Sequence, residues 1–380
     1  MSGSSELGHA AARVADDLIL RSSAFVGATA PDRELVGLAL SKMAQAGLFD
    51  LNYLNSNTSH ISAEDMKRAV SAVTAFAARS LSLTTIYMVN AIFGGAFVAQ
   101  IASPQQKRHL LPAIRAGKLQ LAFAMTEPDA GSDAGAMGTR AVATGQGYAI
   151  SGDKIFTTGA SSADYILVVA RSGGDEKRTV SLFLVPGGAE GVSIEPLARV
   201  SGNVHASCRV TLRDVRVGPE HLLGGPEWLG KAWSIMRFSG SLERIIVAAT
   251  ATGLAEAVTD RALSFAKERR QFGQPLASFQ SLQHLLVEMR TAEIGMRLFV
   301  EHALEMLAAG EVEQAASMAK YHCAEQLQEI VAKGMRIMGG RAFFSFEQMS
   351  RYYCEAPFSL YAGGTNEIQK SLIARSMGIG

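Results

Sequence analysis

The spacing of hydrophobic and polar residues changes twice along the chain. Up to about residue 120, apolar side chains recur at intervals of three and four, the period of helices. Pro31 and Pro104 stand where two of these helices should begin. The pattern predicts a helical region with helices over residues 6–24, 32–47, 62–78, 82–102 and 104–117.

After Leu121 the period shortens to that of strands. Runs rich in Val, Ile, Tyr and Phe are separated by turns that contain Gly, Asp or Pro. The runs are YAISGDKIFTT, ADYILVVAR, VSLFLVP, VSIEPL and CRVTLRDVRV. Strands this short and this closely spaced predict a small barrel or sandwich.

A segment rich in glycine and proline, residues 217–230, precedes a return to the helical period. Long helices are predicted over residues 231–267, 279–308, 312–338 and 365–377. The predicted fold is therefore α+β. It has an N-terminal helical domain (1–120), a middle small β-barrel domain (121–225) and a C-terminal four-helix bundle (226–380).

Composition and charge narrow the class of partner. The 380 residues, 48% of them hydrophobic, are enough for two or three domains. The chain has 36 Lys and Arg against 35 Asp and Glu, a net charge of +1, so no overall field attracts nucleic acid or an anionic membrane. We expect a small-molecule ligand, no nucleic acid and no membrane span. Residues 80–106 carry no charge, but Thr84, Asn90 and Gln100 favour a buried helix over a span.

The chain has three cysteines, Cys208, Cys323 and Cys354. They are far apart and follow no ligand spacing, so we interpret them as packing residues in a reducing compartment and expect no metal site. The amino terminus has Glu6, Asp16 and Asp17 within its apolar pattern, unlike a targeting sequence. A cytoplasmic location is expected.

Common catalytic signatures are absent from the sequence: it has no GxGxxG after a strand, no GxxxxGK[ST], no HExxH and no GxSxG. Ser151 and Lys154 match SxxK, but SGDK is typical of a hairpin turn. Four other stretches combine glycine or proline with polar side chains. They are FAMTEPDAGSDAG (123–135), DKIFTTGASSAD (153–164), KERRQFGQPLASFQ (267–280), and RIMGGRAFF (336–344) together with SLYAGGTNEIQ (359–369).

Each stretch allows a binding and a structural interpretation. Turn amides can hold a phosphate, hydroxyls beside an aromatic ring can meet a planar ligand, and an arginine-rich helix end suits a diphosphate. Paired glycines let the backbone approach a ligand closely. Taken singly, the same stretches are also typical of a capped loop, a buried strand end, a solvated helix end and helix terminators, and for the first and third stretches composition favours the structural interpretation.

Taken together and in this order, the stretches resemble the acyl-CoA dehydrogenase family from about residue 35 to the end. The resemblance implies a homotetrameric FAD enzyme that oxidises the Cα–Cβ bond of an acyl thioester to the trans-2-enoyl thioester. It also implies an electron-transfer flavoprotein as electron acceptor.

The resemblance implies two sets of binding residues. Gly363 would offer its backbone N–H to the substrate carbonyl, and Arg244, Gly240 and Ser132 would line the substrate pocket. The stretch around Arg269 would reach the cofactor of a neighbouring subunit. The residues implied to bind FAD are Met125, Thr126, Ser132, Phe156, Thr158, Arg269, Phe272, Gln280, Arg336, Gly339, Gly340, Thr365 and Glu367.

The resemblance also indicates where the catalytic base lies. Many members have a Glu immediately before the Gly-Thr of the last stretch, where this chain has Gly363. A subset similar to isovaleryl-CoA dehydrogenase has the Glu on the first helix of the C-terminal bundle, before an Arg. In FSGSLERIIVAATATG, Glu243 precedes Arg244 and lies twenty-six residues before Arg269.

The helical period supports Glu243 independently. On a helix it shares a face with Ser239, Gly240, Ile246 and Val247, which would form an apolar recess with room for a ligand. Burial there would raise the pKa of the carboxyl and make it a stronger base. A solvated surface glutamate is the other interpretation of this residue by itself.

The empty position at Gly363 favours a short or branched acyl-CoA as substrate. The alternative is an acyl or aminoacyl group tethered to a carrier protein. Lys107, Arg108 and Arg115 form a basic patch that suits either an acidic carrier protein or a CoA phosphate, so the patch does not separate the two substrates. A flavin monooxygenase and a catalytically inactive interaction protein are further alternatives. Glu243 argues against the first, and the intact cofactor stretches argue against the second.

Three positions depart from the family pattern. Residues 50–62, DLNYLNSNTSHIS, replace a loop rich in Tyr and Gly, which predicts an altered roof over the substrate pocket. Phe156 replaces a tryptophan and Cys354 replaces an arginine, which predicts an altered flavin environment.

Overall fold

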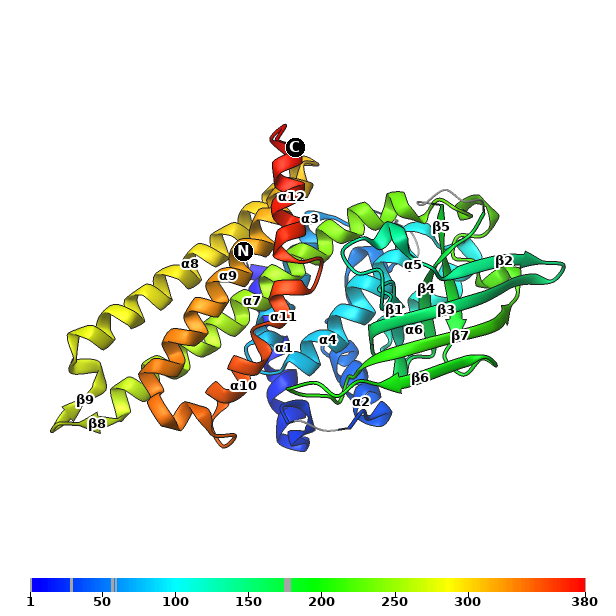
Figure 1. Cartoon of the computed structure of the whole chain (residues 1–380). Coiled ribbons are helices and arrows are strands. Elements are labelled where there is room, and N and C mark those ends of the chain that lie inside the picture. Colours follow the sequence, from blue (N-terminus) through cyan, green and yellow to red (C-terminus); the bar gives the residue numbers. More distant parts are fainter. Residues whose placement is uncertain (1, 28–29, 56–57, 59, 174–178, 380) are drawn as a thin grey trace. The chain divides into compact units, whose positions relative to one another are not determined.

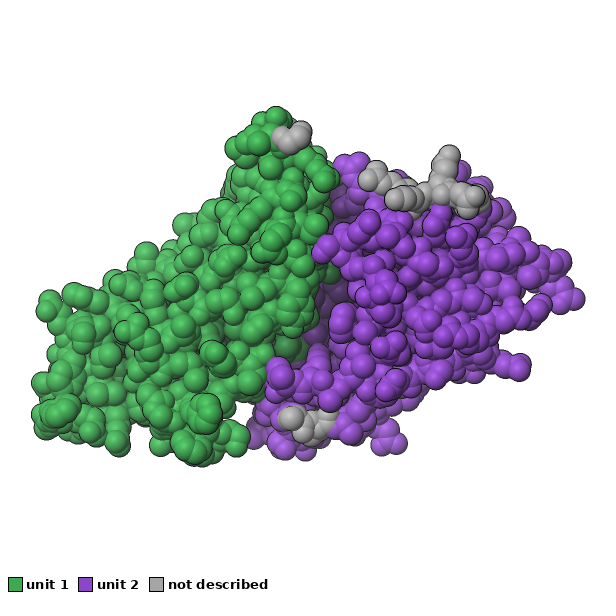
Figure 2. Space-filling model, in the orientation of Figure 1, with its two compact units in different colours: residues 1–12, 70–81, 241–380 green, residues 13–69, 82–240 purple. Residues whose placement is uncertain are grey.

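The structure, a computed structural model, describes residues 2–27, 30–55, 58, 60–173 and 179–379. Contacts within the chain define two compact units (Figure 2). Unit 1 consists of Met1–Ala12, Val70–Leu81 and Ser241–Gly380, and unit 2 of Arg13–Ala69 and Ser82–Gly240. The division into three domains at residues 120 and 225 stays a prediction.

Helices occupy each N-terminal segment for which the period predicts one. Local caps explain where two of them begin: Leu35 N–H donates to Asp32 Oδ1 at 2.9 Å, and Ser103 and Gln106 form a capping box around Pro104. The bounds are α1 Ser2–Arg21, α2 Arg33–Gln45, α3 Ala63–Ala77, α4 Leu81–Tyr87, a π-helical segment Met88–Gly95, α5 Ala96–Ile101 and α6 Pro104–Arg115.

The apolar segment Leu81–Ile101 is long enough to cross a membrane, but 94% of it is buried inside the protein. The prediction of a buried helix is therefore confirmed. Its π-helical part is tied to the sheet, because Asn90 Oδ1 accepts a hydrogen bond from Leu121 N–H at 2.9 Å. A Cβ at Gly94 would come within 2.3 Å of Leu121 Cδ1 and 3.0 Å of its Cβ, so a larger residue here would require the Leu121 side chain to move.

Seven strands form one curled sheet in unit 2 (Figure 1). β1 runs parallel to β4, whereas β3 pairs with β2 and β7 in antiparallel fashion. The hydrogen-bonded order is β1-β4-β2-β3-β7-β6, and β5 pairs with β4. The bounds are β1 Leu121–Ala124, β2 Arg140–Thr144, β3 Gly147–Thr158, β4 Tyr165–Arg171, β5 Val180–Pro186, β6 Val192–Pro196 and β7 Ser207–Val217.

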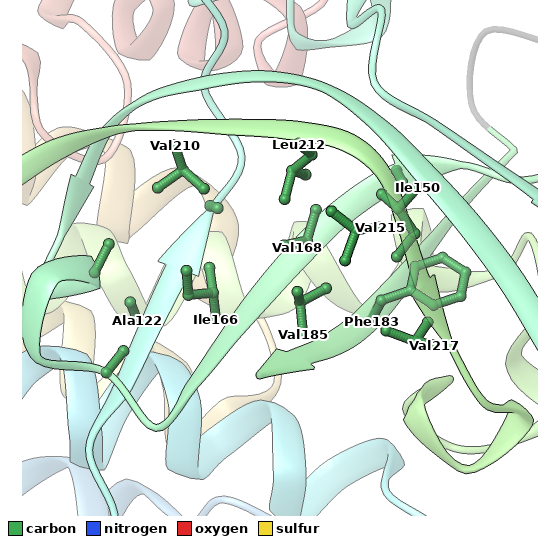
Figure 3. Packing of buried hydrophobic residues seen from close by; sticks show 14 of the residues in the cluster. Ala122, Ile150, Ile166, Val168, Phe183, Val185, Val210, Leu212, Val215 and Val217 are labelled. Atoms are coloured by element: carbon green, nitrogen blue, oxygen red, sulfur yellow. The ribbon is translucent and has the colours of Figure 1, made fainter. Parts of the chain in front are cut away.

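The concave side of this sheet encloses an apolar core (Figure 3). Side chains of β4 and β5, such as Ile166, Val168 and Val185, point toward Val210 and Leu212 of β7, and all five are fully buried. β4 and β5 read as continuous apolar runs because both of their faces are covered. The core holds β1 and β3, which carry the first two candidate stretches.

The prediction of a hairpin turn at Ser151 to Lys154 is wrong. These residues lie inside β3, where a bulge shifts the pairing with β7 between Ile150 and Gly152. Gly152 has φ +154°, and a Cβ there would meet Thr139 Cα at 2.6 Å. The glycine therefore serves a bulge and a close backbone approach instead of a turn.

Long helices make up most of unit 1, as the period predicts. α7 (Ala232–Glu268) begins in unit 2 and continues through unit 1, and α8 (Gln280–Ala309) and α9 (Val312–Met338) pack against each other. Gly310, with φ +83°, ends α8 just before α9 begins, so the two helices are antiparallel. The last helix is α12 (Asn366–Ser376), which packs on α9.

Some elements of unit 1 are too short to show a period. They are the hairpin of β8 (Arg270–Gln271) and β9 (Gln274–Pro275) and the helices α10 (Gln348–Glu355) and α11 (Phe358–Tyr361). Cys208 and Cys323 are buried, as packing residues should be. Cys354 on α10 is exposed, so the packing interpretation is wrong for it.

Candidate active site

Glu243 and Gly363 face each other in unit 1. Glu243 lies on α7, and Gly363 lies in the turn between α11 and α12. A Cβ built on Gly363 would be 3.5 Å from Glu243 Cγ and 3.7 Å from its Cδ. It would also lie 3.6 Å from Val247 Cγ2, so the predicted apolar face of α7 borders this position. A side chain at residue 363 would therefore point at the Glu243 carboxyl.

The surroundings of Glu243 suit a base. Its side chain keeps some contact with solvent, but protein atoms pack densely around the carboxyl. This burial raises the pKa of Glu243 to about 7, although the charges of Arg244 and Lys320 and the Gly363 N–H lower it. Near neutral pH the carboxyl is therefore present in both forms and can accept or return a proton.

The backbone of the turn explains why this position is a glycine. Gly363 has φ +69° and Gly364 has φ +88°, a left-handed conformation that other residues adopt only with strain. The Thr365 hydroxyl accepts a hydrogen bond from Ile368 N–H at 3.4 Å and caps α12. Gln369 Nε2 donates to the carbonyl oxygens of Gly363 and Gly364 at 3.0 and 3.1 Å. The turn is thus held from its carbonyl side, and the Gly363 N–H is directed at Glu243.

Lys320 of α9 belongs to the same site, although sequence patterns did not indicate it. Its fully buried ammonium donates to Gly364 O at 2.7 Å, to Asn366 Oδ1 at 2.8 Å and to Leu360 O at 3.0 Å. The signal in the sequence is a lysine within the buried stripe formed by Ala316, Cys323 and Leu327. A charge at a core position of an amphipathic helix marks a residue with a specific partner.

Of the other predicted pocket residues, Arg244 lies in the same unit as Glu243, whereas Gly240 and Ser132 do not. Arg244 is half-buried beside Glu243, and its Nε has no hydrogen-bond partner among the described residues. Burial lowers the pKa of Arg244, although the nearby Glu243 and Glu313 carboxylates raise it. Gly240 and Ser132 belong to unit 2, so their place in a pocket with Glu243 stays a prediction.

The first two stretches predicted to bind flavin lie side by side in unit 2. Met125 and Thr126 follow β1, and both of their carbonyl oxygens are held by β3. Lys154 Nζ donates to Met125 O at 3.0 Å, and Ile155 N–H donates to Thr126 O at 2.9 Å. Ser132 is exposed in the loop that follows.

The end of β3 presents groups that fit a planar ring such as that of FAD. Phe156 has φ +58°, a strained conformation for an aromatic residue, and the residue is 64% exposed. The next residue, Thr157, has a buried hydroxyl with no hydrogen-bond partner in the part of the chain that the structure describes. Thr158 Oγ1 lies 2.8 Å from Ser207 Oγ. An aromatic face beside hydroxyl groups can hold the ring of a flavin by stacking and hydrogen bonds.

The remaining residues predicted to bind flavin form two groups, one at the C-terminal end of α9 and one beside Lys320 in its N-terminal half. Arg336, Gly339 and Gly340 lie at its C-terminal end, and the antiparallel α8 places Gln280 at the same end. Next to Gln280 is the β8–β9 hairpin, on which Phe272 is 94% exposed and Arg269 precedes the first strand. Thr365 and Glu367 begin α12, beside Lys320. Lys320 and Met338 are separated by about 27 Å of helix. In Figure 1, α12 and the β8–β9 hairpin lie toward opposite ends of α9.

Two family models match this chain. "Acyl-CoA dehydrogenase, middle domain" matches residues 122–215, and "Acyl-CoA dehydrogenase, C-terminal domain" matches residues 233–378. The two matches cover the candidate flavin stretches of unit 2 and the helix that carries Glu243.

The chain is also similar to characterised proteins over nearly all of its length. It is 33% identical to a 3-(aryl)acrylate reductase of Clostridium sporogenes, over 89% of each chain. It is 32% identical to the caffeyl-CoA reductase-Etf complex subunit CarC of Acetobacterium woodii, over 88% of each chain. Among solved structures, an acyl-CoA dehydrogenase from Geobacillus kaustophilus superimposes with a TM-score of 0.83 at 28% identity, covering 96% of this chain and 93% of that one.

Proposed function

Since the chain belongs to the acyl-CoA dehydrogenase family of FAD-dependent oxidoreductases that act on CH–CH bonds, we propose that it converts a short or branched acyl-CoA to the trans-2-enoyl thioester. The observation that carries this proposal is the juxtaposition of the Glu243 carboxyl with Gly363. A base and a backbone donor are thereby available at one point in unit 1, which is the arrangement that removal of a proton next to a thioester carbonyl requires.

The residues of this chain have separate roles in the reaction. The ionised Glu243 carboxylate takes the proton from the substrate α-carbon. The Gly363 N–H, which contacts that carboxylate in the structure, donates to the thioester oxygen as negative charge develops there. FAD, when bound, accepts the β-hydride. Arg244, partly buried beside Glu243, favours the ionised form of the base.

The proposed preference for a short or branched acyl group rests on the space beside Glu243. A side chain at residue 363 would point toward the carboxyl and toward Val247. With glycine at this position, that volume is available to substituents near the α- and β-carbons of the substrate.

Reduction of an enoyl thioester is a second candidate function. Two relatives that match most of this chain are named as reductases of an arylacrylate and of caffeyl-CoA. A carboxyl with a pKa of about 7 can deliver a proton as readily as it accepts one. The same groups would then act in reverse order.

A carrier-bound acyl group is the alternative to acyl-CoA. The basic patch expected to meet a carrier protein or a CoA phosphate includes Arg115, which forms an ion pair with Asp50 at 2.9 Å and is partly neutralised. An electron-transfer flavoprotein is the proposed electron acceptor, in line with the name of the Acetobacterium relative. The cytoplasm is the proposed location.

The proposal predicts that the flavin absorbance of the purified protein is bleached under anaerobic titration with isovaleryl-CoA or a related short acyl-CoA. The rate should rise about tenfold per pH unit below pH 7 and level off above it, because only ionised Glu243 accepts the proton. Stopped-flow absorbance from pH 5 to 9 measures both. If only carrier-bound acyl groups bleach the flavin, the carrier alternative is correct.

Reduction of an enoyl thioester would show a different pH dependence. If the protein is a reductase, chemically reduced flavin should be reoxidised by an enoyl-CoA or arylacrylyl-CoA, at a rate that falls as the pH rises through about 7. A yellow protein that responds to no thioester in either direction would contradict both functions.

We further propose that the protein is a homotetramer in which flavin sites are shared. The two groups of flavin residues in unit 1 are too far apart to hold one diphosphate, so different copies of the chain would supply them. The exposed face of α8 also carries an apolar stripe of Val287, Ile294 and Leu298 at helical spacing, which is typical of a helix interface.

Ile294→Asp should therefore lower the molar mass measured by light scattering and reduce the fraction of protein that retains FAD, because a charge enters the apolar stripe. Val142→Asp is the control, since Val142 is exposed on β2 and lies outside this stripe. A fully assembled Ile294→Asp protein would exclude this face as the interface.

A further inference from the structure

Lys320 is a buried cation whose hydrogen-bond acceptors are neutral oxygens. Its side chain is 0% exposed, and the three donors of the ammonium are satisfied by two backbone carbonyls and an asparagine side chain. Burying an ammonium without a hydrogen-bonded carboxylate costs stability that an apolar residue in the same place would not. The position of this charge therefore calls for an explanation beyond packing.

The hydrogen bonds of Lys320 fix one face of the turn before α12. They hold the carbonyls of Leu360 and Gly364, which flank Gly363 in the chain, and the side chain of Asn366. Gln369 holds the Gly363 carbonyl from α12. The Gly363 N–H of the same turn lies close enough to the Glu243 carboxyl to lower its pKa.

The charge of Lys320 acts on the base itself. Glu243 and Arg244 face the ammonium from α7, Glu325 from α9 and Glu367 from α12. Glu325 is otherwise occupied, because it accepts from Asn366 Nδ2 at 3.1 Å and pairs with Lys370 at 3.6 Å. Burial lowers the pKa of Lys320 to about 8, so the ammonium is still mostly charged at neutral pH.

We propose that Lys320 is a positioning residue of the active site: its ammonium locks the Leu360–Gly364 turn that places Gly363 against Glu243. The same positive charge favours the ionised form of Glu243. The proposal rests on the proposed role of Glu243. Its electrostatic part can nevertheless be measured without turnover.

The test is a titration of the Glu243 carboxyl in protein labelled with [δ-¹³C]glutamate, with Glu243→Gln used to assign the signal. The wild-type signal should titrate near pH 7, and Lys320→Met should raise that pKa by about one unit, because a positive charge near a carboxylate lowers its pKa. Lys333→Met is the matched control. Lys333 lies on the same helix, pairs with Glu288 at 2.9 Å and is about 20 Å further along α9.

Two further measurements keep the inference testable if Lys320→Met does not fold. In the wild-type protein the same signal should show a second, smaller inflection near pH 8, where Lys320 loses its proton. Lys320→Arg, which keeps the charge, should leave the Glu243 pKa within about 0.3 units of wild type. A wild-type signal with no second inflection, together with an unchanged pKa in Lys320→Met, would overturn the inference.

Kinetics then separate this inference from the proposed function. If a thioester bleaches the wild-type flavin, Lys320→Met should lower the reduction rate at least tenfold at pH 7 and move its pH profile to higher pH. A lysine with a merely structural role would lower protein stability without moving either the profile or the carboxyl signal. If no thioester bleaches the wild type, the proposed function fails, and the carboxyl titration still decides the inference.

Discussion

Glu243→Gln should slow the reduction of FAD by substrate about 10²- to 10⁴-fold, the usual contribution of a general base. Glutamine has nearly the same shape as glutamate but cannot accept the proton. The measurement is anaerobic stopped-flow absorbance with the thioester that bleaches the wild-type protein. Glu256→Gln, thirteen residues further along α7 and also half-buried, should keep the wild-type rate. A wild-type rate in Glu243→Gln would assign the base to another residue.

A double variant tests whether residues 243 and 363 share one site. Because a Cβ at residue 363 would lie 3.5 Å from Glu243 Cγ, Gly363→Glu in the Glu243→Gln background should place a carboxyl in the same space and restore part of the rate. The recovery should be partial, since a glutamate at φ +69° carries about 1–2 kcal/mol of backbone strain. Gly363→Ala in the same background supplies the strain without the carboxyl and should restore nothing.

Lys154→Met should lower the free energy of unfolding by about 3–5 kcal/mol and weaken FAD retention, because it leaves a buried carboxylate without its cation. Lys154 is fully buried and pairs with Glu127 at 2.8 Å, while the same ammonium holds Met125 O in the first flavin stretch. Denaturant unfolding and flavin retention on a desalting column measure the two effects.

The neighbouring residue on β3 provides the control. Asp153 pairs with Arg213 at 3.1 Å, but the Arg213 side chain is 62% exposed and the Asp153 side chain 37% exposed, so Arg213→Met should cost less than about 1 kcal/mol. If the two variants lost the same free energy of unfolding, the buried Lys154–Glu127 pair would contribute no more stability than the more exposed Arg213–Asp153 pair.

The Lys154–Glu127 pair should also make the stability of the protein depend on pH. Burial alone would raise the pKa of Glu127, but hydrogen bonds from Lys154, Thr139 and Gly138 outweigh it and leave the pKa below its usual value. A carboxyl with a lowered folded-state pKa stabilises the protein above its unfolded value of about 4.3, and this contribution is lost as the pH falls through the folded pKa. Lys154→Met should therefore flatten the fall in stability below about pH 4.5.

The spacing of apolar residues predicted the helices and strands, because each of these elements is specified by residues that are close together in the sequence. The helix over residues 312–338 has the same bounds in the structure, since apolar side chains recur at helical spacing between a preceding glycine and Gly339. SGDK in β3 has the sequence pattern of a turn, because a glycine that serves a bulge cannot be told from a glycine that serves a turn by its neighbours in the sequence.

The sequence by itself determined the order of helical and strand regions, the resemblance to a family and the pairing of Glu243 with an empty position at Gly363. These conclusions depend on spacing along the chain and on short motifs. The tertiary structure alone decided the chemistry around them. Lys320 is separated from Glu243 by 77 residues and from Gly363 by 43, and no local pattern relates their positions. The pKa of Glu243 depends on which atoms pack around the carboxyl, and only folding brings α7, α9 and the turn before α12 to the same place.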